Sequence, residues 1–250
     1  MSNVKILPAA RPDSRSGIGI SLNDFYAYMP KHNYIYTPTG EIWAGASINS
    51  RISPINESGV VLSPTLWLDK NKPVEQMTWA PGRPMIIPNK LISDGGWMDR
   101  NNVNCFNLYR PPTIKLGSQE KAGLWIEHVG KIYPDDAQHM INFFAHRLQK
   151  PQEKINHALV LGGAQGIGKD TIIEPIKHAV GPWNFAEVSP KQLVGRFNGY
   201  LKSVILRVSE ARDLGTEMDQ SSFYEHMKTY TASPPDTLRV DEKHLREYTV

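Results

Sequence analysis

A glycine-rich segment at residues 163–171 carries the clearest chemistry in the sequence. It reads Gly163-Ala164-Gln165-Gly166-Ile167-Gly168-Lys169-Asp170-Thr171, with the spacing G-x-x-x-x-G-K. Glycines let consecutive backbone N–H groups turn toward phosphate oxygens, and a helix that follows adds the positive end of its dipole. Lys169 at the end of such a loop reaches the β- and γ-phosphates. The segment therefore predicts an ATP-binding loop formed by these nine residues.

The residue after this lysine departs from the usual pattern. Phosphate-binding loops place a magnesium-binding Ser or Thr there, whereas this chain has Asp170 and offers its nearest hydroxyl at Thr171. The arrangement resembles the G-K-G-T loops of nucleotide kinases. Thr171 is therefore one candidate Mg²⁺ ligand among several.

A second candidate group follows an apolar run at residues 203–208. P-loop ATPases end such a strand with an acidic pair, one residue for Mg²⁺ and one for the attacking water. Ser209 and Glu210 take these places here. We expect Glu210 to act as the general base beside the catalytic Lys169, and Ser209, Glu210 and Thr171 to surround the metal.

The elements around these residues alternate between strand and helix. His157–Leu161 is a short apolar run typical of a buried parallel strand. Thr171–Val180 reads as a helix that ends at Gly181. With the run at 203–208, this order predicts an α/β domain with a P-loop NTPase parallel-sheet core over residues 156–250.

Two regions with different residue patterns precede that core. In 119–155, apolar residues recur at helical spacing around Trp125–Ile132 and again after Asp135 and Asp136, which predicts two helices separated by Pro134. Residues 1–118 hold 12 of the 19 prolines and read as a loop-rich region with short strands. The predicted strands are 34–36, 41–43, 60–62 and 85–87.

Composition excludes several classes of protein. The single cysteine, Cys105, rules out an intramolecular disulfide framework and a multi-cysteine metal cluster. No apolar run is long enough to span a bilayer, so no membrane contact is expected, and the expected compartment is a reducing cytoplasm. The net charge of +3 neither indicates nor excludes nucleic-acid binding.

Several motifs together resemble the helicase domain of phage and prophage primase–helicase and primase-polymerase proteins, a branch of the superfamily 3, AAA+-like ATPases. The matching motifs are Gly162–Asp170, Phe197-Asn198-Gly199, Ser209–Asp213, Lys228, 233–243, and in the lead-in 25–30, 79–82 and 146–151. The resemblance implies an ATP- and Mg²⁺-dependent motor that moves on single-stranded or forked DNA, usually as a homo-oligomeric ring, in the cytoplasm of a bacterial host. It also implies a polar sensor on a later strand and an arginine from a neighbouring subunit. The sequence stops at Val250, where that strand is expected to begin, so we expect the ATPase core to be incomplete at its C-terminus.

A basic turn near the end offers a candidate DNA contact. Leu238–Val240 and Glu247–Val250 read as two strands joined by a turn that holds Lys243 and His244. Superfamily 3 helicases carry a DNA-gripping hairpin in this region, so Lys243 and His244 are expected to contact the nucleic-acid backbone. A solvated charged turn is the alternative.

Three functions fit these observations. The leading interpretation is an ATP-dependent DNA helicase module of a phage-type replication protein. A truncated fragment that binds ATP and DNA without turnover is the second. A P-loop nucleotide kinase is the third, although the sequence shows no acceptor site or arginine-rich lid.

Overall fold

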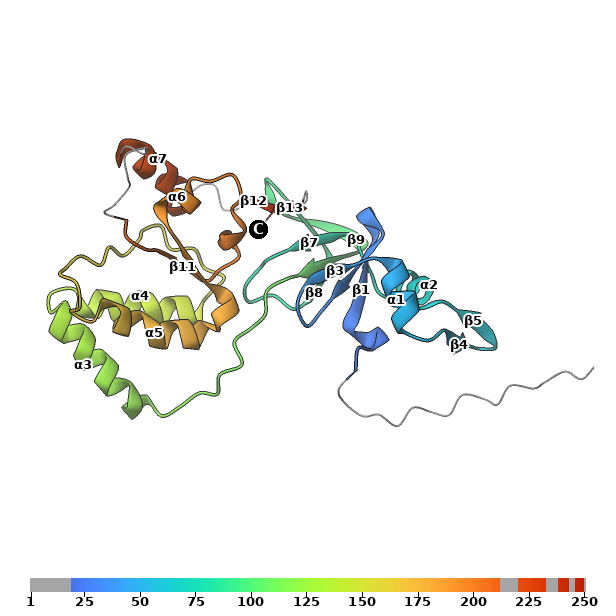
Figure 1. The fold of residues 1–250 in the computed structure, drawn as a ribbon, viewed down its shortest axis with the longest axis horizontal. Helices are drawn as coiled ribbons and strands as arrows, with labels where there is room; N and C mark the ends of the chain where they lie inside the picture. Colours follow the sequence, from blue (N-terminus) through green and yellow to red (C-terminus); the bar gives the residue numbers. More distant parts are fainter. Residues whose placement is uncertain (1–18, 212–219, 233–237, 243–245, 250) are drawn as a thin grey trace, which may run out of the picture. The chain divides into compact units, whose positions relative to one another are not determined.

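The computed structural model describes residues 19–211, 220–232, 238–242 and 246–249. The chain forms two compact units, Met1–Pro73 and Val74–Val250, which are described separately. Both mix helices with small sheets, so the structure confirms an α/β architecture (Figure 1). No helix within the described ranges has the length and apolar character needed to cross a bilayer.

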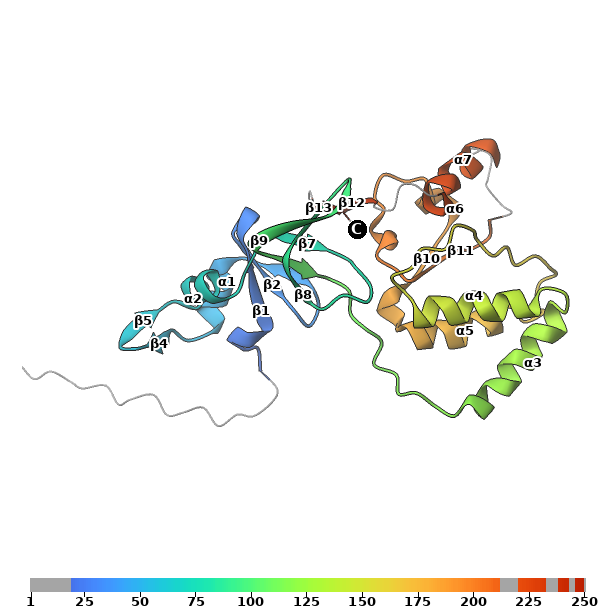
Figure 2. The ribbon, with the colours of Figure 1, turned by 180° about the vertical axis from the view of Figure 1, so that it is seen from behind.

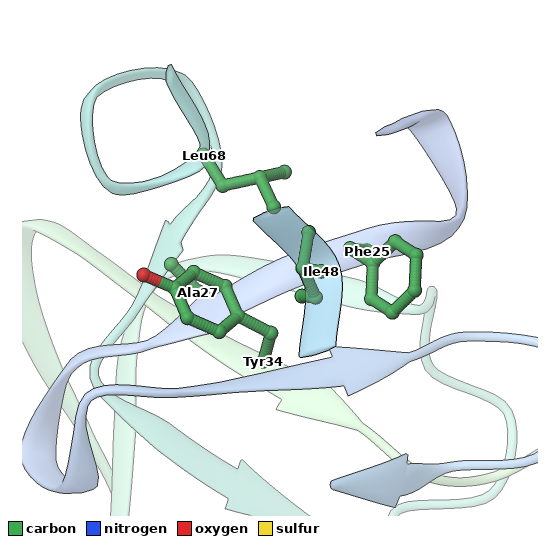
Figure 3. Packing of buried hydrophobic residues seen from close by; sticks show 5 residues of the cluster. All are labelled: Phe25, Ala27, Tyr34, Ile48 and Leu68. Atoms are coloured by element: carbon green, nitrogen blue, oxygen red, sulfur yellow. The ribbon is translucent and has the colours of Figure 1, made fainter. Parts of the chain in front are cut away.

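The first unit is built on a small antiparallel sheet. Strands β1 (Phe25–Tyr28), β2 (Asn33–Tyr36) and β3 (Glu41–Trp43) pair in sequence order, and β6 (Pro73–Val74) adds to β1. Period-2 alternation places Phe25 and Ala27 on the buried face, where they form a core with Tyr34, Ile48 and Leu68 (Figure 3). The core thus joins the sheet to two helices.

Those two helices were not predicted. They are α1 (Gly45–Arg51) and α2 (Pro64–Asn71), and each is too short to show a helical period clearly. The side chain of Ser63 accepts a hydrogen bond from the Leu66 amide at 3.3 Å and Pro64 occupies the first turn, which fixes the start of α2. Between the helices lies the hairpin β4 (Ile55–Glu57) and β5 (Val60–Leu62). The strands predicted at 34–36, 41–43 and 60–62 are confirmed.

The second unit opens with a three-stranded sheet in the order β7-β9-β8. Strand β7 (Gln76–Thr78) runs parallel to β9 (Gly96–Asn107), and β8 (Ile86–Ser93) pairs with β9 as a long hairpin. The prediction of only short strands before residue 118 was wrong here, because polar residues interrupt the alternation along the exposed part of β9. At the end of β9, the side chain of Asn107 binds the segment between β7 and β8: its Nδ2 donates to the carbonyls of Ala80 and Arg83, at 2.8 and 3.0 Å.

Three helices form the core of the α/β part. They are α3 (Gly123–Ile132), α4 (Ala137–Gln149) and α5 (Lys169–Val180). Helices α4 and α5 run alongside each other, and α3 packs against both (Figure 2). Their apolar faces meet in one cluster of buried side chains, formed by Val129, Met140, Phe144, Ile172 and Ile176. All three predicted helices are confirmed, with α5 beginning two residues earlier than expected.

One parallel strand pair lies beside these helices. Strands β10 (Phe185–Val188) and β11 (Ile205–Val208) pair in parallel, and the strand predicted at 203–208 is β11. The strand predicted at His157–Leu161 is wrong, since that segment joins no ladder among the described residues. Leu159 and Leu161 pack against the helical cluster, whereas Val160 is 90% exposed. Helices therefore partly cover the two leucines of this run, and a larger parallel sheet is not formed by the described residues.

The remaining elements are a strand hairpin, several helical segments of three or four residues and one twelve-residue helix. Strands β12 (Arg239–Glu242) and β13 (Arg246–Thr249) form an antiparallel hairpin, which confirms the predicted strand pair. Lys243 and His244 lie outside the described residues. The other helices are η1 (Leu22–Asp24), η2 (Met29–Lys31), η3 (Gln119–Ala122), η4 (Pro182–Asn184), α6 (Pro190–Leu193), η5 (Gly199–Leu201) and α7 (Gln220–Thr231).

Candidate functional site

Three glycines of the glycine-rich loop adopt backbone conformations that favour glycine. Gly163, Gly166 and Gly168 have φ angles of 138°, 81° and 99°, a region that residues with a Cβ rarely adopt. Gly168 precedes α5 as its N-cap residue. The loop therefore leads directly into a twelve-residue helix, whose first N–H groups have no partner within the helix and point toward the loop.

Lys169 lies within the loop that it ends. Its ammonium Nζ donates to the carbonyl oxygens of Gly163 at 2.9 Å and Ala164 at 2.8 Å. Among the described residues these are its only hydrogen bonds, and no carboxylate pairs with it. The positive charge is thus held by neutral acceptors, which leaves it available to an anion.

A side chain of α3 and that of Tyr133, which directly follows α3, form hydrogen bonds with the loop. His128 Nε2 lies 3.1 Å from the Gly168 carbonyl, and the hydroxyl of Tyr133 donates to the Gly162 carbonyl at 2.7 Å. Since a carbonyl only accepts, Nε2 of His128 carries the hydrogen. Burial raises the pKa of Tyr133, which keeps its hydroxyl a donor.

A further hydrogen bond from α3 reaches the first turns of α5. The indole Nε1 of Trp125 donates to the Ile172 carbonyl at 2.9 Å. The sequence predicted a helix around Trp125–Ile132 but did not connect Trp125 or His128 to the loop. One feature of the sequence could have indicated this link: Trp125 and His128 can donate hydrogen bonds yet lie on an otherwise apolar face, and buried donors need partners.

The residue that departs from the loop pattern has a defined partner. Asp170 Oδ1 accepts a hydrogen bond from Arg207 Nη2, so an ion pair joins the start of α5 to β11. Arg207 Nε also lies 3.7 Å from Glu187 Oε1 on β10, where Glu187 is its register partner. The hydroxyl of Ser209 donates to the same Glu187 oxygen. Arg207 and Glu187 were not identified from the sequence.

The other predicted site residues are placed as follows. Thr171 is exposed on the first turn of α5, and Glu210 is exposed two residues after the end of β11. Glu210 has a φ of 58°, a left-handed conformation that is uncommon for a residue with a side chain. Ile167 Cδ1 lies 2.6 Å from the point where a Cβ on Gly163 would be, so the loop folds tightly over its first glycine. Gln165 is exposed at the turn of the loop.

The residues of the loop fit a nucleotide with bound Mg²⁺. Within the described ranges, no three His, Cys, Asp or Glu side chains are arranged to hold a metal ion by themselves. Mg²⁺ that arrives with a nucleotide needs only one or two protein ligands, because phosphate and water oxygens complete its octahedron. The exposed hydroxyl of Thr171 suits such a role, whereas the Asp170 carboxylate is engaged by Arg207.

Comparisons with known proteins agree with the fold and leave the activity open. Residues 161–250 match a family of unknown function, DUF5906. No curated protein matches the chain in sequence. Two apo structures of the NrS-1 C-terminal region share its fold with a TM-score of 0.58 and 15% identity over 90% of this chain. A third has a TM-score of 0.56 and 14% identity. The chain spans about half the length of these structures, 50% or 51%.

Proposed function

We propose that the chain binds ATP through residues 163–171 and is the ATPase module of a phage-type DNA replication protein, with helicase activity driven by hydrolysis. The observation that carries the nucleotide part is the Lys169 ammonium, held at 2.8 and 2.9 Å from two loop carbonyls at the start of α5. A mobile cation beside a glycine-rich loop and a helix N-terminus is the arrangement that binds phosphate groups.

Each predicted residue has a role in this proposal. The loop N–H groups and Lys169 bind the phosphates, and Thr171 provides a hydroxyl toward Mg²⁺. When bound, Mg²⁺ neutralises charge on the phosphate oxygens. Glu210 accepts the proton of the attacking water, and Ser209 lies beside it at the end of β11.

The replication part rests on motifs rather than on contacts. The motifs resemble those of phage primase–helicase proteins, and the fold shared with the NrS-1 C-terminal region is compatible with that resemblance. DNA is the proposed partner, and a homo-oligomeric ring in the host cytoplasm is the proposed assembly. In this proposal Lys243 and His244, which follow β12 in the sequence, contact the DNA backbone.

The decisive experiment measures ATP turnover by the purified chain with and without single-stranded DNA. Lys169→Ala is expected to abolish turnover, while the control Lys131→Ala is expected to leave it unchanged, because Lys131 pairs with Glu127 on the exposed side of α3. Turnover that DNA does not stimulate would favour a small-molecule kinase. Nucleotide binding without turnover would favour a fragment that binds ATP only.

The DNA contact has its own test. Lys243→Ala is expected to weaken single-stranded DNA binding and to reduce the slope of log affinity against log salt by about 0.7, the change expected for one phosphate contact. An unchanged affinity and slope would remove Lys243 from the proposed interface.

A further inference from the structure

The carboxylate of Asp170 lies where its negative charge would repel the phosphates of the proposed nucleotide. Asp170 directly follows Lys169 and lies in the first turn of α5, where incoming phosphates would be bound. Its side chain is 78% exposed, so it is not sequestered from that space. A free carboxylate at this position would repel a di- or triphosphate, since like charges within a few ångströms destabilise one another.

Arg207 is positioned to offset that charge. It extends from β11 and its Nη2 donates to Asp170, while its Nε faces Glu187 at 3.7 Å. The Arg207 side chain is only 33% exposed, compared with 78% for Asp170. Arg207 on β11 and Glu187 on β10 are in register, so the pairing of the two strands fixes the position of the Arg207 backbone from which the side chain extends.

We infer that Arg207 is a positioning residue for the nucleotide: its guanidinium neutralises Asp170, so that phosphates can bind beside a carboxylate that would otherwise repel them. This inference rests on the proposed nucleotide-binding function. Arg207 acts through Asp170 and does not bind the phosphates. The same pair also ties the loop to β11, the strand that leads to Ser209 and Glu210.

A double-mutant cycle tests this role through binding rather than turnover. The probe is ADP without Mg²⁺, titrated by calorimetry into the wild-type chain, Arg207→Ala, Asp170→Asn and the double variant. Arg207→Ala is expected to weaken ADP binding about tenfold, a size that allows for solvent screening of the exposed carboxylate. Asp170→Asn is expected to bind at least as tightly as wild type, and the double variant is expected to match Asp170→Asn.

Two controls separate charge from folding. Arg207→Lys keeps the positive charge and is expected to restore most of the affinity. Raising the salt concentration is expected to shrink the defect of Arg207→Ala, because screening weakens the unpaired Asp170 charge. Melting temperatures report whether each variant folds. If Arg207→Ala does not fold, Asp170→Asn still tests the inference, since weaker ADP binding by that variant would overturn it.

The remaining outcomes are distinct. A double variant as weak as Arg207→Ala would show that Arg207 contacts phosphate directly, which overturns the inference. Wild-type affinity in Arg207→Ala would also overturn it. By contrast, no ADP binding by the wild-type chain, or unchanged binding by Lys169→Ala, would mean that the proposed function itself has failed.

Discussion

The carboxamide of Asn198 pairs with the backbone of β12 on both sides of Val240. Its Nδ2 donates to the Arg239 carbonyl at 2.9 Å, and the Asp241 amide donates to its Oδ1 at 2.6 Å. The Asn198 amide also donates to the Asp241 carbonyl at 3.1 Å. One residue thus supplies the bonds that a neighbouring strand would supply, and it fastens the C-terminal hairpin to the segment before η5.

Asn198→Ala is therefore expected to loosen the hairpin. Loss of two side-chain bonds to backbone groups destabilises the local structure by about 1–3 kcal/mol. Hydrogen–deuterium exchange at residues 238–242 and 246–249 should become faster. The control is Asn142→Ala, because Asn142 accepts a bond from Gln138 on the exposed face of α4 and its loss should leave the hairpin unchanged.

Gly168 and Gly166 provide a matched pair of substitutions in the loop. Both have positive φ, but a Cβ on Gly168 would lie 2.8 Å from His128 Cε1, whereas a Cβ on Gly166 would meet nothing within 4 Å. Gly166→Ala is expected to cost about 1 kcal/mol of unfolding free energy from backbone strain alone. Gly168→Ala is expected to cost about 2–4 kcal/mol, because overpacking adds to the strain. Equal costs in urea titrations would contradict the contact with α3.

Arg147 is expected to be the most sensitive charged residue of α4. Its guanidinium donates to the Val204 carbonyl through Nε at 3.2 Å and through Nη2 at 2.9 Å, and burial lowers its pKa. Arg147→Ala removes these bonds and leaves the carbonyl of the buried Val204 without these donors, so unfolding free energy should fall by about 2–4 kcal/mol.

The comparison for Arg147 is Lys150, which caps the C-terminal end of the same helix. Lys150 makes an exposed ion pair with Glu153, with 3.2 Å between Nζ and Oε1, and Lys150→Ala should cost less than about 1 kcal/mol. Arg147→Lys tests the geometry, because an ammonium cannot reproduce the two fork-like donors of the guanidinium to the Val204 carbonyl. Full stability in Arg147→Lys would show that charge alone suffices.

Tyr34 should make the first unit sensitive to alkali. Burial, with a hydrogen bond to Asp69 and the charge of that carboxylate, raises the pKa of Tyr34 to about 12 from an ordinary value of 10.0. The unfolded chain ionises first, so the stabilisation is complete below pH 10 and is lost as pH rises toward 12. At pH 11 the loss is about 1 kcal/mol.

The Tyr34→Phe variant isolates this effect. It lacks the hydroxyl that lies 3.0 Å from Asp69 Oδ1, so it should be less stable than wild type at pH 8. The gap between the two proteins should narrow by about 1 kcal/mol between pH 8 and pH 11. Urea titrations at these pH values measure the gap, and a constant difference would mean that the Tyr34 pKa is close to its ordinary value.

Local patterns explain what the sequence could predict. The helices α3, α4 and α5 follow from apolar residues at helical spacing, with Pro134 and Gly181 marking ends. The loop shape also follows from local residue types, since Gly163, Gly166 and Gly168 adopt the positive φ that glycine permits.

Contacts between distant segments explain what could not be predicted. The Asp170–Arg207 ion pair joins residues 37 positions apart, and it depends on how β11 packs beside α5. The bonds of His128 and Trp125 to the loop and α5 span 40 and 47 positions. For His157–Leu161, the apolar pattern predicted a buried strand, whereas only Leu159 and Leu161 are partly buried, and helices cover them, because periodicity alone does not distinguish helical from strand neighbours.

The support that α3 gives the loop has a practical consequence for dissecting the chain. A fragment cut at residue 161, where the family match begins, would keep Lys169 and every glycine of the loop. It would lose the donors on Trp125, His128 and Tyr133, and with α3 and α4 it would lose three of the five buried side chains of the helical cluster. The shortest expression fragment that retains the loop in its observed shape therefore has to begin before Gly123.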